Sequence, residues 1–300
     1  MLKYMKPISP YTVPKVLLLG NGINRAFDGQ KWEHLLKEIC KQPFTDAEWA
    51  VLRKMPYPLL AVAVTGDDLA TAMKDKADSF VNMEIPKEER EIIKQVVGDS
   101  FDAILTTDYS YEIEHSLCDD FAVKKWRQSP YRHHTCDRKS KALTESLYQY
   151  IEVCYNGKEV SVWHMHGEAA RPDTMVIGHS YYGNIIARMQ KHITESLRAH
   201  RMAEKQHKEY YPRSWVDYFL YGDVYIVGQG LSVHELDLWW LISAKKRSGM
   251  GSIYYFEPNA GIAKQTLSDA YDVNIIKLPV YNDDYKQYYR DVAKYLKEET

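Results

Sequence analysis

The chain has 300 residues, enough to bury a large core as one α/β domain or two smaller ones. Its hydrophobic fraction of 45% and charged fraction of 27% are those of a globular protein, and a formal charge of -2 gives no sign of a nucleic-acid binder. Residues 1–14 hold no apolar segment of signal-peptide length, and the longest apolar run, 59–64, is far too short to cross a membrane. We expect a cytoplasmic protein with neither a nucleic-acid nor a membrane partner.

Four cysteines are spread along the chain, at Cys40, Cys118, Cys136 and Cys154. They form no Cys-x-x-Cys pair, so the spacing predicts neither a zinc ribbon nor a dense disulfide framework. We expect reduced thiols with structural roles.

Short apolar runs alternate with helical patterns from one end of the chain to the other. Strands are expected at 16–20, 103–107, 160–166, 175–178, 224–228, 253–257 and 273–278. Most of these runs lack strict polar alternation, as strands do when both faces of a parallel sheet are covered. The pattern predicts a single α/β domain over 1–300, a Rossmann-like, doubly wound and mainly parallel sheet.

Helical spacing is clearest at 32–39, from Leu143 to Cys154, and in the apolar run that begins at Glu235. Residues from about 43 to 100 have further helical patterns and are expected to form a helical insertion. A second helical segment, from about 185 to 215, is rich in Arg, Lys, His and Glu. It is expected to be a long helix whose charged side chains face solvent. The alternative interpretation is that these charges contact another subunit.

The first strand ends at Gly20-Asn21-Gly22, and Asn24 follows closely. In a Rossmann-type unit, two glycines at this place let the backbone approach a pyrophosphate. The third glycine of the dinucleotide fingerprint is replaced by Arg25, and no acidic residue ends an obvious second strand. By itself the stretch fits a structural turn equally well.

Polar residues also end the later strands. Thr107 and Asp108 follow the second strand at the ligand-binding edge of the sheet, although Asp108 or Ser110 would more often be a helix cap. His164 and His166 share one face of a strand. An imidazole at such a strand end could be a general base or, with ligands from elsewhere, a zinc ligand, whereas for His164 alone we favour a satisfied structural histidine.

A second glycine turn, Gly228-Gln229-Gly230, follows the strand at 224–228. Ser232 is a candidate N-cap for the next helix, which has acidic Glu235 and Asp237 near its start. Glu257 ends the next strand, where a carboxylate can accept hydrogen bonds from a ribose diol.

Taken in order, these stretches resemble the sirtuin-like superfamily, in its bacterial NAD-consuming branch. The resemblance runs from about residue 16 to 278. It rests on the strand-glycine opening followed by W-x-x-L-L at 32–36, TT-x-Y at 106–109, the HG pair at 166–167, and IVGQGLS at 226–232. The order of these short motifs carries the specificity.

The resemblance implies roles for the residues that match the family. His166 would be the catalytic histidine beside the nicotinamide ribose, acting as base on a ribose hydroxyl or on the attacking water. The nucleotide would be bound by Gly20, Asn21, Gly22 and Asn24 at the pyrophosphate, by Thr107, by Gly228 and Ser232 in the second turn, and by Glu257 at the adenosine ribose.

Two departures from the family bear on the chemistry. Related NADases have Asn where this chain has Asp108; a carboxylate there can bind ribose hydroxyls and stabilise a developing oxocarbenium cation. The four-cysteine zinc module of the protein deacetylases is missing, which argues against acyl-lysine removal.

The resemblance thus implies an NAD glycohydrolase that releases nicotinamide and ADP-ribose, with NAD as substrate and no metal. It would serve anti-phage defence and be restrained by homo-oligomer contacts or a regulatory protein, with the inserted helices as the candidate surface. A silent NAD or ADP-ribose sensor module is the alternative, for which Asp108 is the best support. A third reading is a metal-dependent hydrolase built around His164 and His166.

Overall fold

The computed structural model describes residues 7–8, 13–29, 32–66, 69–81, 83–121, 133–135, 146–248 and 250–299. An eight-stranded sheet in the order β3-β4-β5-β2-β1-β6-β7-β8 organises this part of the chain. The strands are β1 (Lys15–Leu19), β2 (Ala103–Thr106), β3 (His133–Thr135), β4 (Gln149–Tyr155), β5 (Lys158–His164), β6 (Asp223–Val227), β7 (Ile253–Phe256) and β8 (Val273–Ile276). All neighbouring strands from β5 to β8 are parallel, and only the β3–β4 and β4–β5 pairs are antiparallel. The predicted α/β class with a mainly parallel sheet is confirmed.

The central strands are apolar because both of their faces are covered. In β1, Leu17 and Leu19 belong to one hydrophobic core, whereas Val16 and Leu18 belong to the core on the other face. Alternation between two cores, with no polar face, explains why the sequence shows a continuous aliphatic run.

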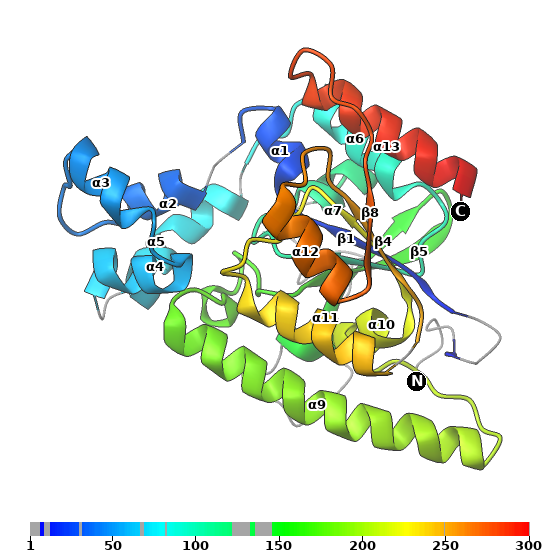
Figure 1. Ribbon diagram of the computed structural model, residues 1–300. Coiled ribbons are helices and arrows are strands. Elements are labelled where there is room, and N and C mark those ends of the chain that lie inside the picture. The colour runs from blue at the N-terminus through cyan, green and yellow to red at the C-terminus, as the bar shows by residue number, and fades with distance from the viewer. Residues whose placement is uncertain are drawn as a thin grey trace.

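Helices form a layer on each face of the sheet (Figure 1). They are α1 (Gly22–Ala26), α2 (Trp32–Glu38), α3 (Asp46–Leu52), α4 (Tyr57–Thr65), α5 (Leu69–Val81), α6 (Lys87–Val97), α7 (Glu112–Leu117), the 3-10 helix η3 (Pro172–Thr174), α9 (His179–Lys205), α10 (Trp215–Tyr221), α11 (Leu236–Ser248), α12 (Ile262–Ala270) and α13 (Tyr285–Glu299). Helices α1, α6, α7 and α13 contribute to one core, and α9, α10 and α11 to the other. Among the described residues, no helix is long and apolar enough to cross a membrane.

Helices α2 to α5 project from the sheet as a separate group (Figure 1). The first turn of α3 is fixed by a capping box, in which Glu48 N–H donates to Thr45 Oγ1 at 3.3 Å and Thr45 N–H donates to Glu48 Oε2 at 2.7 Å. Helix α6, which the sequence placed in the same insertion, instead packs against α13 and α7 over the sheet. The inserted group is therefore α2–α5, and α6 is the crossover helix between β1 and β2.

Two elements expected from the sequence are wrong. Residues 175–178 form no strand; they are a buried extended segment whose Val176 N–H donates to His166 O at 2.7 Å. The helix expected from Leu143 to Cys154 is largely β4, and Leu143 itself lies outside the described residues. Strand β4 returns into β5 through Asn156-Gly157, both with positive φ (49° and 75°), which is the residue pair that two-residue hairpins prefer.

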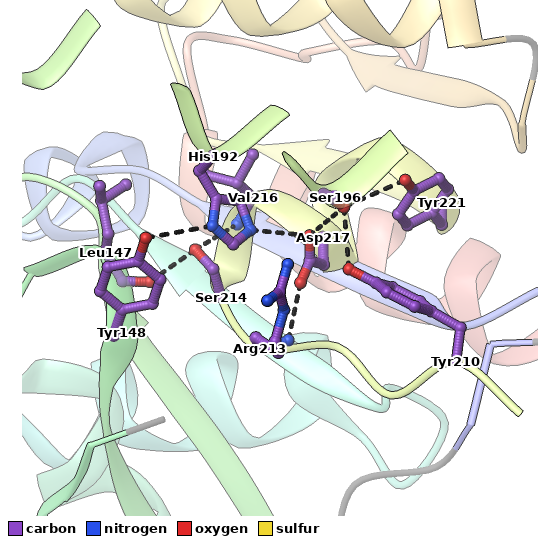
Figure 2. A network of polar contacts seen from close by, with 10 residues as sticks. All are labelled: Leu147, Tyr148, His192, Ser196, Tyr210, Arg213, Ser214, Val216, Asp217 and Tyr221. Carbon is purple, nitrogen blue, oxygen red and sulfur yellow. Dashed lines mark hydrogen bonds and ion pairs between the residues drawn. The ribbon is translucent and has the colours of Figure 1, made fainter. Parts of the chain in front are cut away.

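The long helix expected in the second half of the chain is α9, which begins and ends earlier than predicted. Its buried face carries polar groups that converge on Asp217 of α10 (Figure 2). His192 Nε2–H donates to Asp217 Oδ1 at 2.8 Å, and Ser196 Oγ–H donates to the same oxygen at 2.6 Å. Arg213 N–H donates to Asp217 Oδ2 at 2.7 Å. These bonds attach α9 to α10 through one carboxylate.

This network has the residue types of a catalytic triad but not its arrangement. The serine hydroxyl donates to the aspartate and not to the histidine, and Ser196, Asp217 and His192 are only 0%, 0% and 2% exposed. No substrate reaches these side chains, so their role is structural.

Replacing Asp217 by alanine should lower the free energy of unfolding by about 3 kcal/mol, because His192 and Ser196 would lose a buried charged partner. Urea denaturation at pH 7 measures the loss. Burial would raise the pKa of Asp217, but the hydrogen bonds and charge of His192 and the other donors hold it below its ordinary value. The stabilisation is therefore present above the unfolded-state pKa and is lost as the pH falls through the lower, folded-state pKa.

The control is Glu195→Ala on the exposed face of α9, where the Lys191–Glu195 pair spans 4.0 Å. It should change stability by less than about 0.5 kcal/mol. Equal losses for the two variants would contradict the structural role given to Asp217.

Candidate active site

The two glycine turns lie side by side at the centre of the sheet. Strand β1 lies between β2 and β6, so the chain crosses over to opposite sides of β1. A switch of this kind opens a ligand crevice at the carboxyl ends of the strands. Gly20 N–H donates to Val227 O at 2.9 Å and Gly22 N–H donates to Gly228 O at 2.8 Å, which joins the turn after β1 to the turn after β6.

This contact explains why the turns contain glycine. A Cβ atom on Gly22 would lie 2.6 Å from Gly228 Cα, and one on Gly20 would lie 2.9 Å from Gly228 O. Gly228 also has a φ of +68°, which L side chains rarely adopt. The amides of Gly20 and Gly22 are donated to Val227 O and Gly228 O, so a phosphate bound at these turns would need hydrogen-bond donors from other groups.

A cavity of about 690 Å³ opens beside the turns, within the size range of ligand pockets. Most of the predicted site residues line it: Asn21, Gly22, Asn24, Thr107, Asp108, His166, Gly228 and Ser232. The inserted helices contribute Tyr57, Pro58 and Phe80 to its wall, and α9 contributes Tyr182. The cavity therefore combines the carboxyl edge of the sheet with side chains from the insertion.

Several predicted ligand groups are held by protein partners. Thr107 Oγ1–H donates to Gln229 Oε1 at 3.0 Å. Ser232 does not cap α11, which begins at Leu236; its Oγ accepts from His234 N–H at 3.3 Å, and its own N–H donates to Glu235 Oε2 at 2.6 Å. These bonds shape the second turn.

Glu257 follows β7 as predicted but does not line the cavity. Its carboxylate is 2.5 Å from Lys264 Nζ and accepts a hydrogen bond from the Tyr255 hydroxyl at 2.8 Å. Burial opposes these donors, but together they hold the pKa of Glu257 below its ordinary value. Lys264 Nζ and the Tyr255 hydroxyl also donate to Gly230 O, at 2.9 and 3.1 Å, so the partners of Glu257 connect it to the second glycine turn.

His166 is the best-placed acid–base group in the cavity. The side chain is 6% exposed, and its Nε2–H donates to Asp237 Oδ2 at 2.6 Å. Asp237 lies in the first turn of α11, where the helix dipole also favours a negative charge. Burial lowers the pKa of His166, but the charge and hydrogen bond of Asp237 outweigh it, and the net pKa is raised. Tyr182 closes the other side, with its ring at 5.5 Å from the imidazole.

His164 and His166 are only two residues apart, but their surroundings differ. His164 Nδ1–H donates to the backbone O of Asp108 at 2.8 Å, and Nε2 lies 2.9 Å from Glu114 Oε1. Burial lowers its pKa, but Glu114 outweighs burial and raises it to about 9. His164 is therefore a cationic structural group that holds the Asp108 loop, as the structural reading of this histidine predicts.

Asp108 follows β2 and lines the cavity. The helix-cap interpretation is wrong, because α7 begins after Tyr111 with no side-chain cap, and the Ser110 hydroxyl donates to Glu112 Oε1 at 2.6 Å. Burial raises the pKa of Asp108 well above its ordinary value, helped by the charge of Glu112 and opposed by that of His164.

The geometry gives no support to a metal site at the two histidines, since each ring contacts a different carboxylate. In the part of the chain that the structure describes, no group of three or more His, Cys, Asp or Glu residues is arranged to hold a metal ion. Cys40, Cys118 and Cys154 form no disulfide with one another, and Cys136 lies outside the described residues.

Sequence reasoning missed Asp237 as the partner of His166. Its position in the first turn of a helix was visible, but a contact across 71 positions of sequence was not. No protein-family model matches this chain, and a search of curated proteins finds no match to it. A functional assignment therefore depends on the geometry of the cavity.

The turn-to-turn contact predicts a contrast between two glycine substitutions. Gly22→Ala should lower the thermal unfolding midpoint by several degrees, because the new methyl group meets the Gly228 backbone, which cannot move aside. Gly183→Ala is the control, since a Cβ on this exposed glycine of α9 meets nothing within 4 Å. It should stabilise the protein by about 0.5–1 kcal/mol. Unchanged stability of Gly22→Ala would show that the turns can separate without cost.

Proposed function

We propose that the protein is an NAD glycohydrolase that cleaves the nicotinamide–ribose bond to give nicotinamide and ADP-ribose. The observation that carries the proposal is the buried His166–Asp237 pair, with a 2.6 Å hydrogen bond, in a cavity that also contains Asp108 and the two glycine turns. A histidine held by a carboxylate is a common arrangement for a general base near neutral pH.

The proposed step uses water as the second substrate. As the bond between ribose C1′ and the pyridinium nitrogen breaks, nicotinamide leaves as a neutral molecule with the bonding electron pair, and positive charge develops on the ribose. Water attacks C1′ and gives its proton to His166, whose Nε2–H is engaged by Asp237, so that Nδ1 is the accepting atom. Asp237 stabilises the imidazolium that results.

Asp108 fits the same step. Asp108 lines the cavity, and its backbone oxygen is held by the His164 imidazole. Positive charge that develops on a ribose beside Asp108 favours the ionised form of this carboxyl group, which then stabilises the oxocarbenium-like cation. At the other groups of the nucleotide, the side chains of Asn21, Asn24 and Arg25 are the polar candidates for the pyrophosphate, since all three line the cavity.

The surroundings of the cavity suggest how such an enzyme is restrained. On α4, Leu59 and Val62 are 42% and 38% exposed, although they are apolar, and Tyr57 and Pro58 of the same helix line the cavity. A homo-oligomer or a regulatory protein that covers this surface would act on the cavity wall. In the proposed role, drawn from the family resemblance, cytoplasmic NAD is depleted during phage infection.

His166→Ala should reduce nicotinamide release from NAD by about 10²- to 10⁴-fold, because it removes the general base. Chromatography of nicotinamide and ADP-ribose at several protein concentrations measures this. Glu195→Ala, on the exposed face of α9, is the control and should retain the wild-type rate. If wild-type protein binds NAD but forms no product, the chain is a nucleotide-binding sensor module instead.

Asp237→Asn should change the pH dependence as well as the rate. The carboxylate raises the pKa of His166, and the base must be unprotonated to accept a proton. Removing its charge should therefore move the acidic limb of the kcat/KM profile to lower pH, while the maximum rate falls by about 10²-fold or more. A limb that does not move would show that His166 is not the titrating base.

A further inference from the structure

Three carboxylates from separate parts of the chain line the cavity together. Glu89 belongs to the first turn of α6, Asp108 follows β2, and Glu112 begins α7. Burial and the charge of Glu112 raise the pKa of Glu89 to about 7, and Glu112 and Glu89 both add to the raised pKa of Asp108. The three groups are therefore close enough to repel one another.

Glu89 is buried without a partner. It is 5% exposed, and its carboxylate has no hydrogen bond or ion pair with any residue in the described ranges. Lys286, whose charge slightly lowers the pKa of Glu89, is 3.3 Å from Glu88 and 4.2 Å from the centre of the Phe27 ring. Buried carboxylates in proteins normally have a donor or counterion, and because Glu89 lines the cavity, a ligand can supply one.

The neighbouring groups do not balance this charge on the cavity side. Glu112 Oε1 accepts one hydrogen bond, from the neutral Ser110 hydroxyl at 2.6 Å. His164 bonds to the backbone oxygen of Asp108 and the carboxylate of Glu114, and its charge only partly offsets the raised pKa of Asp108 and Glu112. The side of the cavity bounded by α6, α7 and the loop after β2 therefore holds three carboxyl groups with raised pKa values, and a cation bound among them would stabilise their ionised forms.

We propose that Glu89, Asp108 and Glu112 form a subsite for an organic cation, and that it recognises the positively charged pyridinium end of the nucleotide. The identity of this cation rests on the proposed function, whereas the recognition of positive charge does not. Nicotinamide loses its charge when the glycosidic bond breaks, so the same carboxylates that favour the substrate release the product.

The test compares the 1-methylnicotinamide cation with nicotinamide, its neutral counterpart, by calorimetric titration of the full chain. The wild-type protein should bind the cation at least about tenfold more tightly, because a charge-assisted contact replaces a neutral one. Glu89→Gln should abolish most of this preference. If that variant does not fold by circular dichroism, Glu112→Gln should show the same loss.

Glu33→Gln is the matched control, since Glu33 also lines the cavity but is paired with Lys37 at 3.6 Å. It should keep the preference for the cation. Equal binding of the two probes by the wild-type protein, or equal losses in Glu33→Gln and Glu89→Gln, would overturn the proposal. Neither probe contains a glycosidic bond, so failure to cleave NAD would leave this result standing, and failure to prefer the cation would leave NAD cleavage standing.

Discussion

The close contact between the turns after β1 and β6 is the constraint on which the site depends. The hydrogen bonds from Gly20 and Gly22 bring two backbone segments together where no side chain fits. The second turn leads into α11, whose first turn carries Asp237, and β5 ends close to His166. The position of the imidazole against its carboxylate thus follows from the order of the strands in the sheet and from two residues that lack a Cβ atom.

His164 and His166 have the same side chain but different hydrogen-bond partners. His164 ends β5 and His166 follows two residues later, but His164 contacts Glu114, whereas His166 contacts Asp237 and lines the large cavity. The first is held as a permanent cation that positions a loop. The second bonds to Asp237 through Nε2 and lines the cavity. Burial lowers the pKa of each histidine and a neighbouring carboxylate raises it, but of the two only His166 lines the large cavity.

Much of the fold could be predicted from the sequence because its signals are local. The aliphatic runs at β1, β2 and β6, with glycines after β1 and β6, fix strands and turns within a few residues. The prediction of a helix at 143–154 is wrong because the apolar spacing there is compatible with both the helical period and the strand period. The Asn156-Gly157 pair that follows is a hairpin signal and favours the strand. Asp237 and Glu89 could not be assigned, since each acts through contacts between segments distant in sequence.

The inserted helices α2–α5 have a mechanical consequence. They supply one wall of the cavity through Tyr57, Pro58 and Phe80, but the His166–Asp237 pair comes from β5 and α11 on the other side. Cavity volume and acid–base geometry are therefore set by different parts of the chain. A displacement of the inserted group changes the space open to a ligand without altering the His166–Asp237 hydrogen bond, so the opening of the cavity and the geometry of this pair can change separately.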